Sequence, residues 1–266
     1  KNQESSGELF WGAEYAIMAV MKAFLSIFFH NETNDKSEKG RLHIPDDKTL
    51  WPDSWKKIAY KRYALMRALP LPDVAGPFFD GVLRERRSSV GYILGNTPTL
   101  PTLSYVLRCG YGLQAVMQQD KREGHRTVPS GGQRYPLEIY LFLFRDIEAV
   151  ASGIYHYGIR EHTLEPVVKR DFSQADILRM TPIKWLKDTQ GMFCITSVSS
   201  RMTEKYGSRG YRYILLEAGH AAQNMLLAGT ERGINILPVG GIHEEAVETM
   251  IGLGGSDERA VYTLFF

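Results

Sequence analysis

The chain has 266 residues, of which 44% are hydrophobic and 23% are charged. This composition predicts a folded protein with a sizeable core, built as one large domain or as a domain with an added arm. The 32 basic and 30 acidic residues leave a formal net charge of +2. A balance so close to neutral gives no electrostatic reason to expect binding to nucleic acid or to an anionic membrane.

The N-terminal part of the chain is predicted to be an arm. Its apolar stretch 10–29 has the length of a membrane-spanning helix, but Glu14 and Lys22 interrupt it and no small-residue cleavage site follows. We therefore expect an amphipathic helix that packs on a core or a partner subunit, and a cytoplasmic location. The proline-dense stretch 69–77 cannot be helical, which predicts a boundary between an arm at 1–77 and a main domain at 78–266.

The main domain is predicted to mix helices and strands without a strict β–α–β alternation, which favours an α+β fold over a doubly wound sheet. Apolar periodicity predicts helices over 79–87, 102–119, 211–232 and 244–251. Runs rich in β-branched and aromatic residues predict strands over 137–144, 154–157, 192–198, 235–239 and 261–266. Small residues along the helix 211–232 allow another helix to approach closely, either in the core or from a second subunit.

The two cysteines, Cys109 and Cys194, stand far apart in the sequence among apolar neighbours. Neither belongs to a CxxC motif or lies at metal-ligand spacing from a histidine. We expect two buried, reduced thiols and no metal site, with a catalytic thiol or a disulfide as open alternatives.

The stretch 129–136 is the most informative short segment. It begins with Pro129, Ser130, Gly131 and Gly132, and a second proline closes it before a predicted strand. Adjacent glycines leave the main chain without Cβ atoms, so a flat or phosphorylated molecule can lie directly against it, while the prolines restrict its conformation. Taken alone, the pattern predicts only a rigid loop before a buried strand.

A cluster at the end of the predicted helix 79–87 combines guanidinium and hydroxyl groups. Its members are Arg86, Arg87 and Ser88. Such groups can hold a phosphate monoester through bidentate, charge-assisted hydrogen bonds, although an arginine cluster alone is more often a solvated face.

A second pair of glycines lies between a predicted strand and a predicted helix. The segment consists of Pro238, Val239, Gly240 and Gly241. Bare main chain where a strand meets a helix is a recurrent place for cofactors. Neither glycine pair of this chain fits a dinucleotide-binding or P-loop motif, so each is weak evidence by itself.

Lys205 and Tyr206 form a candidate catalytic pair. Adjacent side chains face opposite sides of a strand and diverge on a helix, so their cooperation requires irregular backbone, which Gly207 and Gly210 favour. A cation held beside a phenol favours the phenolate, which can act as a base. From the pair alone, the simpler interpretation is a basic loop whose tyrosines only pack.

In their order along the chain, these segments resemble the SagB-type dehydrogenases, the azoline-oxidising branch of the FMN-dependent nitroreductase-like flavoproteins. The matching residues are Arg86-Arg87-Ser88, Pro129-Ser130-Gly131-Gly132, Tyr135-Pro136-Leu137-Glu138, Gly153-Ile154-Tyr155-His156-Tyr157, Leu164-Glu165-Pro166, Lys205-Tyr206, Arg209-Gly210-Tyr211-Arg212-Tyr213, Leu216-Glu217-Ala218-Gly219-His220, Gln223-Asn224 and Pro238-Val239-Gly240-Gly241. The resemblance runs from about residue 51 to the end of the chain. Each motif is modest, but their combined order is specific.

The resemblance implies a nitroreductase-like α+β fold, with a central and mostly antiparallel sheet flanked by helices, in an intertwined homodimer that binds FMN at its interface. It implies that 86–88 hold the phosphate and ribityl end of FMN. It further implies that 129–132 lie along the isoalloxazine edge and that 238–241 complete the bed of the cofactor. Lys205 and Tyr206 match the Lys-Tyr pair that the family uses for catalysis.

Two departures from the family pattern stand out. The family usually continues the Arg-Arg-Ser motif with another basic residue, whereas this chain has Ser89 and Val90, so Arg84 or Arg259 is a candidate replacement. The glycine loop also carries Arg134 where small or aliphatic residues are commoner. That side chain either points away from the cofactor or alters what approaches it.

The resemblance implies an FMN-dependent oxidase that converts peptide thiazolines or oxazolines to thiazoles or oxazoles in natural-product biosynthesis. Tyr206, assisted by Lys205, would remove the Cα proton of the ring, and a cyclodehydratase of the same pathway would be a partner. Two alternatives remain: another FMN oxidoreductase, such as an NAD(P)H-dependent nitroreductase or a dehydroamino-acid reductase, and a catalytically silent scaffold subunit of a peptide-modifying complex.

Overall fold

The computed structural model describes residues 48–50, 79–88, 97–114 and 125–266. The predicted helix at 10–29, the proline-dense stretch 69–77 and Val90 lie outside the described residues. The division into an arm and a main domain therefore stays a prediction. Within the described part of the chain, no helix is long and apolar enough to cross a membrane.

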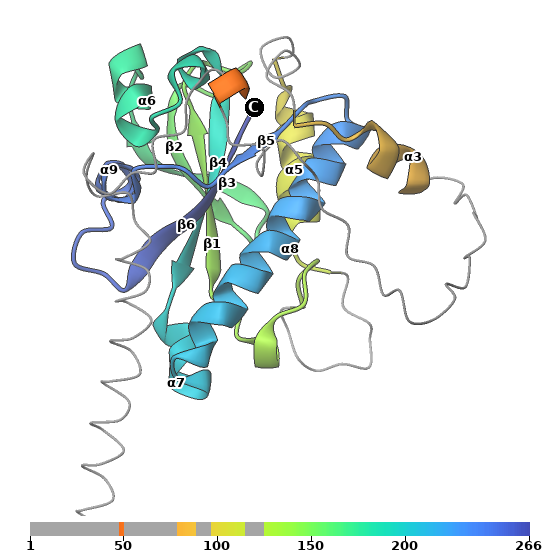
Figure 1. Cartoon of the computed structure of the whole chain (residues 1–266), viewed down its shortest axis with the longest axis vertical. Helices are drawn as coiled ribbons and strands as arrows, with labels where there is room; N and C mark the ends of the chain where they lie inside the picture. Colours follow the sequence, from red (N-terminus) through yellow and green to blue (C-terminus); the bar gives the residue numbers. More distant parts are fainter. Residues whose placement is uncertain (1–47, 51–78, 89–96, 115–124) are drawn as a thin grey trace, which may run out of the picture.

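A six-stranded sheet forms the centre of the fold, and every pair of neighbouring strands in it is antiparallel (Figure 1). The strands are β1 (Leu137–Leu143), β2 (Gly153–Gly158), β3 (Thr163–Lys169), β4 (Gly191–Val198), β5 (Leu237–Val239) and β6 (Glu258–Phe265). Their order across the sheet is β3-β2-β1-β4-β6-β5. The prediction of an α+β fold with a mostly antiparallel central sheet is thus confirmed.

The sheet has a hydrophobic core on each face. Alternating side chains of β1 show the division, because Ile139 and Leu141 belong to one core and Tyr140 and Phe142 to the other. Since both faces of β1 and β4 are covered, these strands are apolar almost throughout and were predictable from sequence.

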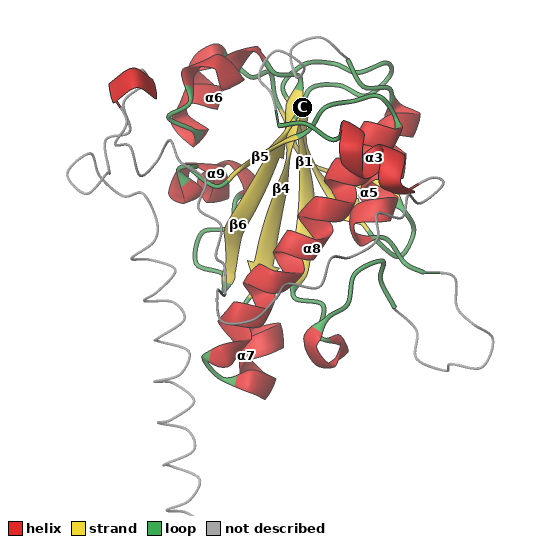
Figure 2. Ribbon diagram, turned by 45° about the vertical axis from the view of Figure 1, so that its right-hand side comes forward, coloured by secondary structure: helices red, strands yellow, loops and turns green. Residues whose placement is uncertain are grey.

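Helices cover both faces of the sheet (Figure 2). The first core packs under α5 (Leu100–Tyr111) and α8 (Arg209–Glu231), and the second packs under α6 (Gln174–Met180) and α9 (Glu244–Ile251). The remaining helices are α3 (Phe79–Glu85), which packs against α8, and α7 (Ser200–Tyr206), which precedes it. Three single 3₁₀ turns are η1 (Lys48–Leu50), η2 (Gly131–Gln133) and η3 (Lys184–Asp188).

The small residues of α8 serve the core of the same chain. Ala218, Ala221 and Ala222 are buried in the first core, and Gly110 of α5 lies so close to Met225 that a Cβ at this position would overlap the Met225 side chain. Close packing of α5 on α8 therefore accounts for this stripe, without a second subunit on that face.

Three elements escaped the sequence analysis. Strand β3 is an edge strand with a mostly exposed face and Pro166 in its middle, so it lacks the apolar run of a central strand. Helices α6 and α7 have only seven residues each, which is too short for a clear helical period. The predicted helix 102–119 begins at Leu100 and ends at Tyr111, where Gly112 takes extended backbone.

We predict that Gly191→Ala destabilises the fold by about 1–3 kcal/mol, because a Cβ at the buried start of β4 would overlap the Phe142 carbonyl oxygen and the Phe266 ring. Gly254→Ala is the matched control, since its Cβ would meet open space, and it should change stability by no more than about 0.5 kcal/mol. Urea unfolding of both variants measures the difference. Equal stability of the two variants would contradict the packing described here.

Candidate active site

Lys205 and Tyr206 occupy the last turn of α7, which ends at Gly207 with a φ of 57°. The prediction of irregular backbone at the pair was therefore wrong. The pair nonetheless meets, because the Lys205 Nζ lies 5.4 Å from the centroid of the Tyr206 ring. Tyr206 in turn packs edge-to-face on Tyr213 of α8, with ring centroids 5.0 Å apart.

The glycine loop holds an unusual left-handed conformation. Gly132 and Gln133 have φ values of 59° and 58°, and Tyr135 follows with 45°. Ser130 stabilises this path, since its side-chain oxygen accepts a hydrogen bond from the Tyr135 N–H at 2.9 Å and its carbonyl accepts one from the Gln133 N–H at 3.1 Å. Non-glycine residues at positive φ cost free energy, so their recurrence here marks a loop that the surrounding structure fixes.

The loop and the Lys-Tyr pair form one cluster. A Cβ on Gly132 would overlap the Tyr206 hydroxyl and come within 2.5 Å of the Lys205 Nζ. Glycine is therefore required at position 132 both for its left-handed backbone and for this close approach. The main chain of the loop thus lies against the two side chains that were predicted to form the catalytic pair.

Further side chains secure this cluster. Gly131 lies against Tyr213 and the sulfur of Met202. The Nε of Arg134 donates a hydrogen bond of 2.8 Å to the Arg201 carbonyl in α7, and its guanidinium lies 3.8 Å from the Glu204 carboxylate. Arg134 therefore fastens the loop to α7.

A buried carboxyl group lies beneath the loop. Glu217 of α8 is only 1% exposed and accepts a hydrogen bond of 2.6 Å from the Tyr111 hydroxyl. The same hydroxyl accepts a bond of 3.3 Å from the N–H of Leu137, where the loop ends and β1 begins. Burial raises the pKa of Glu217, and hydrogen bonding from Ser130 and Tyr111 opposes the rise.

Arg126 accompanies this carboxyl group. Its guanidinium carbon lies 4.7 Å from the ring centroid of Tyr111 and 5.1 Å from that of Tyr135. In the described part of the chain, two of its buried nitrogens and Glu217 Oε2 have no well-formed hydrogen bond. The positive charge of Arg126 lowers the pKa of Glu217, against the larger effect of burial, so the two groups interact electrostatically at the base of the loop.

A series of ion pairs and hydrogen bonds connects α7 to the sheet. His156 of β2 lies between the carboxylates of Glu165, at 2.8 Å, and Glu138, at 3.1 Å. Glu138 also pairs with Arg201 at 2.5 Å, and Arg201 donates a hydrogen bond to the Tyr135 carbonyl. Hydrogen bonding to Glu138 raises the pKa of His156 against the effect of burial. Burial favours the neutral form of Glu138, but His156 and Arg201 outweigh it and lower the pKa of that carboxyl group.

The arginine cluster lies elsewhere, directly after α3. The Arg86 guanidinium donates a hydrogen bond of 2.9 Å to the Ser88 hydroxyl, and Arg87 donates to main-chain carbonyls of this segment. Neither Arg86 nor Arg87 has a carboxylate partner among the described residues. Arg84 is engaged by Asp80 at 2.8 Å.

The second glycine pair lies at the β5 edge of the sheet. The Val239 carbonyl accepts a hydrogen bond of 2.7 Å from the Thr263 hydroxyl, which anchors the end of the strand. Gly240 and Gly241 are exposed, and a Cβ at either position would meet no atom within 4 Å. Arg259 lies 3.9 Å from the Glu248 carboxylate.

The predicted site residues thus fall into separate places in one chain. Figures 1 and 2 show α7 at the N-terminal end of α8 and α3 beside its C-terminal half. With 23 residues, α8 is about 35 Å long. The structure brings 129–132 together with Lys205 and Tyr206, and it does not bring 86–88 or 238–241 to them.

Glu217 and Tyr213 belong to the residues that match the family but had no predicted role, and Tyr111 and Arg126 were not predicted as site residues. For Glu217 a signal was present, because an acidic residue interrupts an otherwise small and apolar face of a predicted helix. The roles of Tyr111 and Arg126 depend on contacts across long stretches of sequence, which periodicity does not reveal.

Residues 83–266 match the Nitroreductase family. The chain belongs to the nitroreductase family. Membership supports an oxidoreductase with a flavin cofactor. MJ1384 of Methanocaldococcus jannaschii, named as a nitroreductase, is 32% identical over 183 residues, which are 69% of this chain and 88% of that protein.

Two relatives are named for the processing of microcin B17 and of trifolitoxin, which agrees with the resemblance to the SagB-type branch. The microcin B17-processing protein McbC of Escherichia coli is 28% identical over 192 residues, covering 68% of this chain and 65% of McbC. The trifolitoxin-processing protein TfxB of Rhizobium leguminosarum is 28% identical over 140 residues, which are 51% of this chain and 38% of TfxB.

Solved structures show the same fold. A chain of the E. coli microcin synthetase complex McbBCD, solved with truncated pro-MccB17 bound, superimposes with a TM-score of 0.70 at 19% identity, covering 100% of this chain and 97% of that chain. A nitroreductase-type protein of Anabaena variabilis gives a TM-score of 0.54 at 23% identity over 90% of this chain and 45% of that one. The nitroreductase-like fold is thereby confirmed.

We predict that His156→Gln removes a pH-dependent part of the stability. Because the folded pKa of His156 is raised, its contribution is fully present below the ordinary value of about 6.5 and is lost as the pH rises through the higher folded value. Urea unfolding should therefore show the largest loss of unfolding free energy for the variant at about pH 6 and little loss at about pH 9.

The exposed His220 of α8 provides the control, and His220→Gln should unfold like the parent protein across this range. If His156→Gln lowers the free energy of unfolding by the same amount at every pH, the ion pairs of His156 contribute nothing to stability.

Proposed function

We propose that the protein is an FMN-dependent oxidase that dehydrogenates thiazoline or oxazoline rings in a peptide. The observation that carries the proposal is the contact of bare main chain at Gly132 with both Lys205 and Tyr206. It supports a site where a flat cofactor edge and a reactive phenol come together on a rigid loop.

The residues present fit FMN by their chemistry. Arg86 and Arg87, which have no carboxylate partners in the described part of the chain, suit a dianionic phosphate. Gly240 and Gly241 leave open space above the main chain, which allows a planar ring system to approach it. The segment 129–132 offers a second strip of main chain beside a cation and a phenol.

The fit requires two copies of the chain. Within one copy, α8 separates 86–88 from Lys205 and Tyr206, so these segments cannot hold one molecule of FMN together. We therefore propose a homodimer in which 86–88 and 238–241 of one protomer face 129–132, Lys205 and Tyr206 of its partner.

The residues of this chain have distinct roles in the proposed reaction. Tyr206 takes the proton from the ring Cα as a general base, and the Lys205 ammonium beside it supplies the positive charge that favours this role. Gly132 gives these two side chains the space to act, and Glu217 and Tyr111 hold the loop in register with β1. When bound, FMN supplies the two-electron acceptor for the hydrogen of the β-carbon, and dioxygen regenerates it.

The relatives support a peptide as the substrate. McbC and TfxB are named for the processing of microcin B17 and trifolitoxin, and the structure with the TM-score of 0.70 contains a bound precursor. We accordingly propose that the substrate is a precursor peptide whose rings a cyclodehydratase of the same pathway has formed. The family name and MJ1384 equally allow an NAD(P)H-dependent reductase, which the experiment below distinguishes.

We predict that Tyr206→Phe and Gly132→Ala each abolish ring oxidation. Tyr206→Phe removes the base and retains the ring that packs on Tyr213, so this variant should keep the visible absorption of bound flavin. The assay is mass analysis of a synthetic peptide with one thiazoline ring, in which turnover appears as the loss of two hydrogens. Thr203→Val on the same helix is the matched control, since the Thr203 hydroxyl donates its hydrogen bond to the Ser199 carbonyl.

Full activity of Tyr206→Phe would overturn the assignment of the base. Rapid bleaching of the flavin by NADPH, without oxidation of the thiazoline peptide, would favour the reductase. A purified protein that lacks flavin absorption and does not take up added FMN would favour the silent scaffold subunit.

A further inference from the structure

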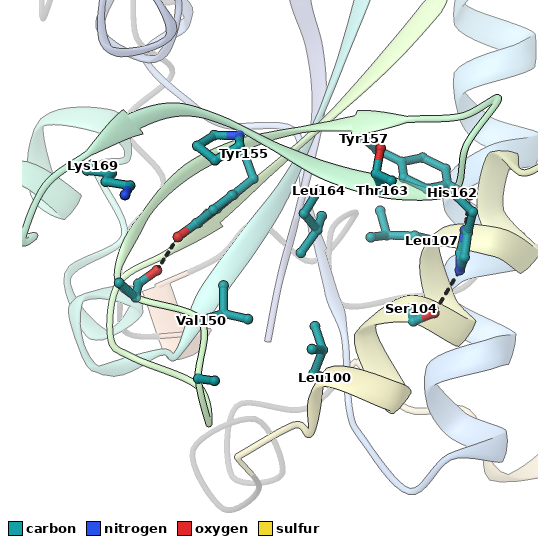
Figure 3. A pocket seen from close by; sticks show the side chains of 13 residues that line it. Leu100, Ser104, Leu107, Val150, Tyr155, Tyr157, His162, Thr163, Leu164 and Lys169 are labelled. Atoms are coloured by element: carbon teal, nitrogen blue, oxygen red, sulfur yellow. Dashed lines mark hydrogen bonds between the residues drawn. The ribbon is translucent and has the colours of Figure 1, made fainter.

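A cavity of about 520 Å³ opens between α5 and the β2–β3 hairpin (Figure 3). Thirteen residues line it, and none of them belongs to the proposed active site. A volume of this order suits a small molecule or part of one. The cavity is therefore a second place where this chain can bind a ligand.

The middle of the cavity is apolar. Leu100 and Leu107 of α5 face Val150 and Leu164 across it, as Figure 3 shows. Tyr155 and Pro166 extend this lining along the hairpin. An apolar ligand of suitable width can bury its surface here, and the hydrophobic effect favours its transfer from water.

One end of the cavity carries a self-contained polar chain. The Tyr157 hydroxyl lies 2.7 Å from His162 Nδ1, and the Ser104 hydroxyl lies 2.7 Å from His162 Nε2. Because these three groups satisfy one another, they can lie beside an apolar ligand without leaving a polar group unpaired. The main-chain N–H groups around Ser104 are used inside α5, so they cannot serve as oxyanion donors for acyl transfer at this serine.

The opposite end carries a cation. Lys169, the last residue of β3, lines the cavity and has no carboxylate partner among the described residues. The neighbouring Tyr155 hydroxyl already donates a hydrogen bond of 2.7 Å to the Ala151 carbonyl. In Figure 3 the amino group of Lys169 is turned toward the Tyr155 ring. Among the described residues that line this end, Lys169 is thus the cationic group that can bind an anion.

We propose that this cavity binds an apolar carboxylate, such as a medium-chain fatty acid. The carboxylate pairs with Lys169, and the apolar body lies between Leu164 and Leu107 with its tail toward His162. This assignment is independent of the proposed oxidase activity, because it shares no residue with that site.

The test is isothermal titration of the full-length protein with octanoate, octanamide and octylamine. These probes share one chain length and differ in charge, so octanoate should bind at least about tenfold more tightly than either of the others. Lys169→Met should weaken the binding of octanoate by a similar factor and leave the binding of octanamide unchanged. The substitution removes the charge and nearly keeps the length of the side chain.

Two further variants locate the site. Ala149→Phe, at an exposed position on the rim, should block all binding by filling the cavity mouth. Lys184→Met removes an exposed lysine that does not line the cavity, so it should bind octanoate like the parent protein.

Octanoate binding that is absent, or no tighter than octylamine binding, would overturn the proposal. So would an equal effect of Lys169→Met and Lys184→Met, or full binding by Ala149→Phe. Octanamide binding as tight as octanoate binding would also overturn the proposal, because Lys169 would then contribute nothing to the affinity.

Discussion

The proposed function depends on the length and stiffness of α8. This single helix of 23 residues carries the Lys-Tyr pair at its N-terminal end, through α7, and has α3 with the arginine cluster beside its C-terminal half. A helix of this length, about 35 Å, does not fold back on itself, so the two groups of residues stay apart in one chain or are brought together by a second copy. The FMN-binding roles proposed for 86–88, 129–132 and 238–241 all depend on this second copy.

Beside this helix, the fold holds the loop 129–132 rigidly, and this loop is one protomer's part of the proposed site. The loop enters β1 in the centre of the sheet, where hydrogen bonds to β2 and β4 fix it on both sides. Glu217 and Tyr111 hold it from below, and Arg134 and Arg201 tie it to α7. A phenol held against fixed main chain needs little reorganisation before it removes a proton, which is the condition for efficient general base catalysis.

Sequence alone predicted the central strands and the long helix well, because β1 and β4 are apolar almost throughout and α8 is long and strongly periodic. It failed at β3 and α7, where Pro166 and a length of seven residues remove the periodic signal. The motif order pointed to the correct family, yet the helical backbone at Lys205 and Tyr206 was not predicted. Their meeting depends on Gly132, more than seventy residues away, and local propensity carries no information on such a contact.

Complementation between two inactive variants tests the shared site most directly. One variant carries Arg86→Ala and Arg87→Ala, the other carries Tyr206→Phe, and differently tagged copies allow purification of the mixed dimer. A site built from two protomers leaves one intact site in each mixed dimer, so we predict about half the parental activity and one bound flavin at that site. Mixed dimers as inactive as each variant alone, or a protein that stays monomeric, would contradict the account.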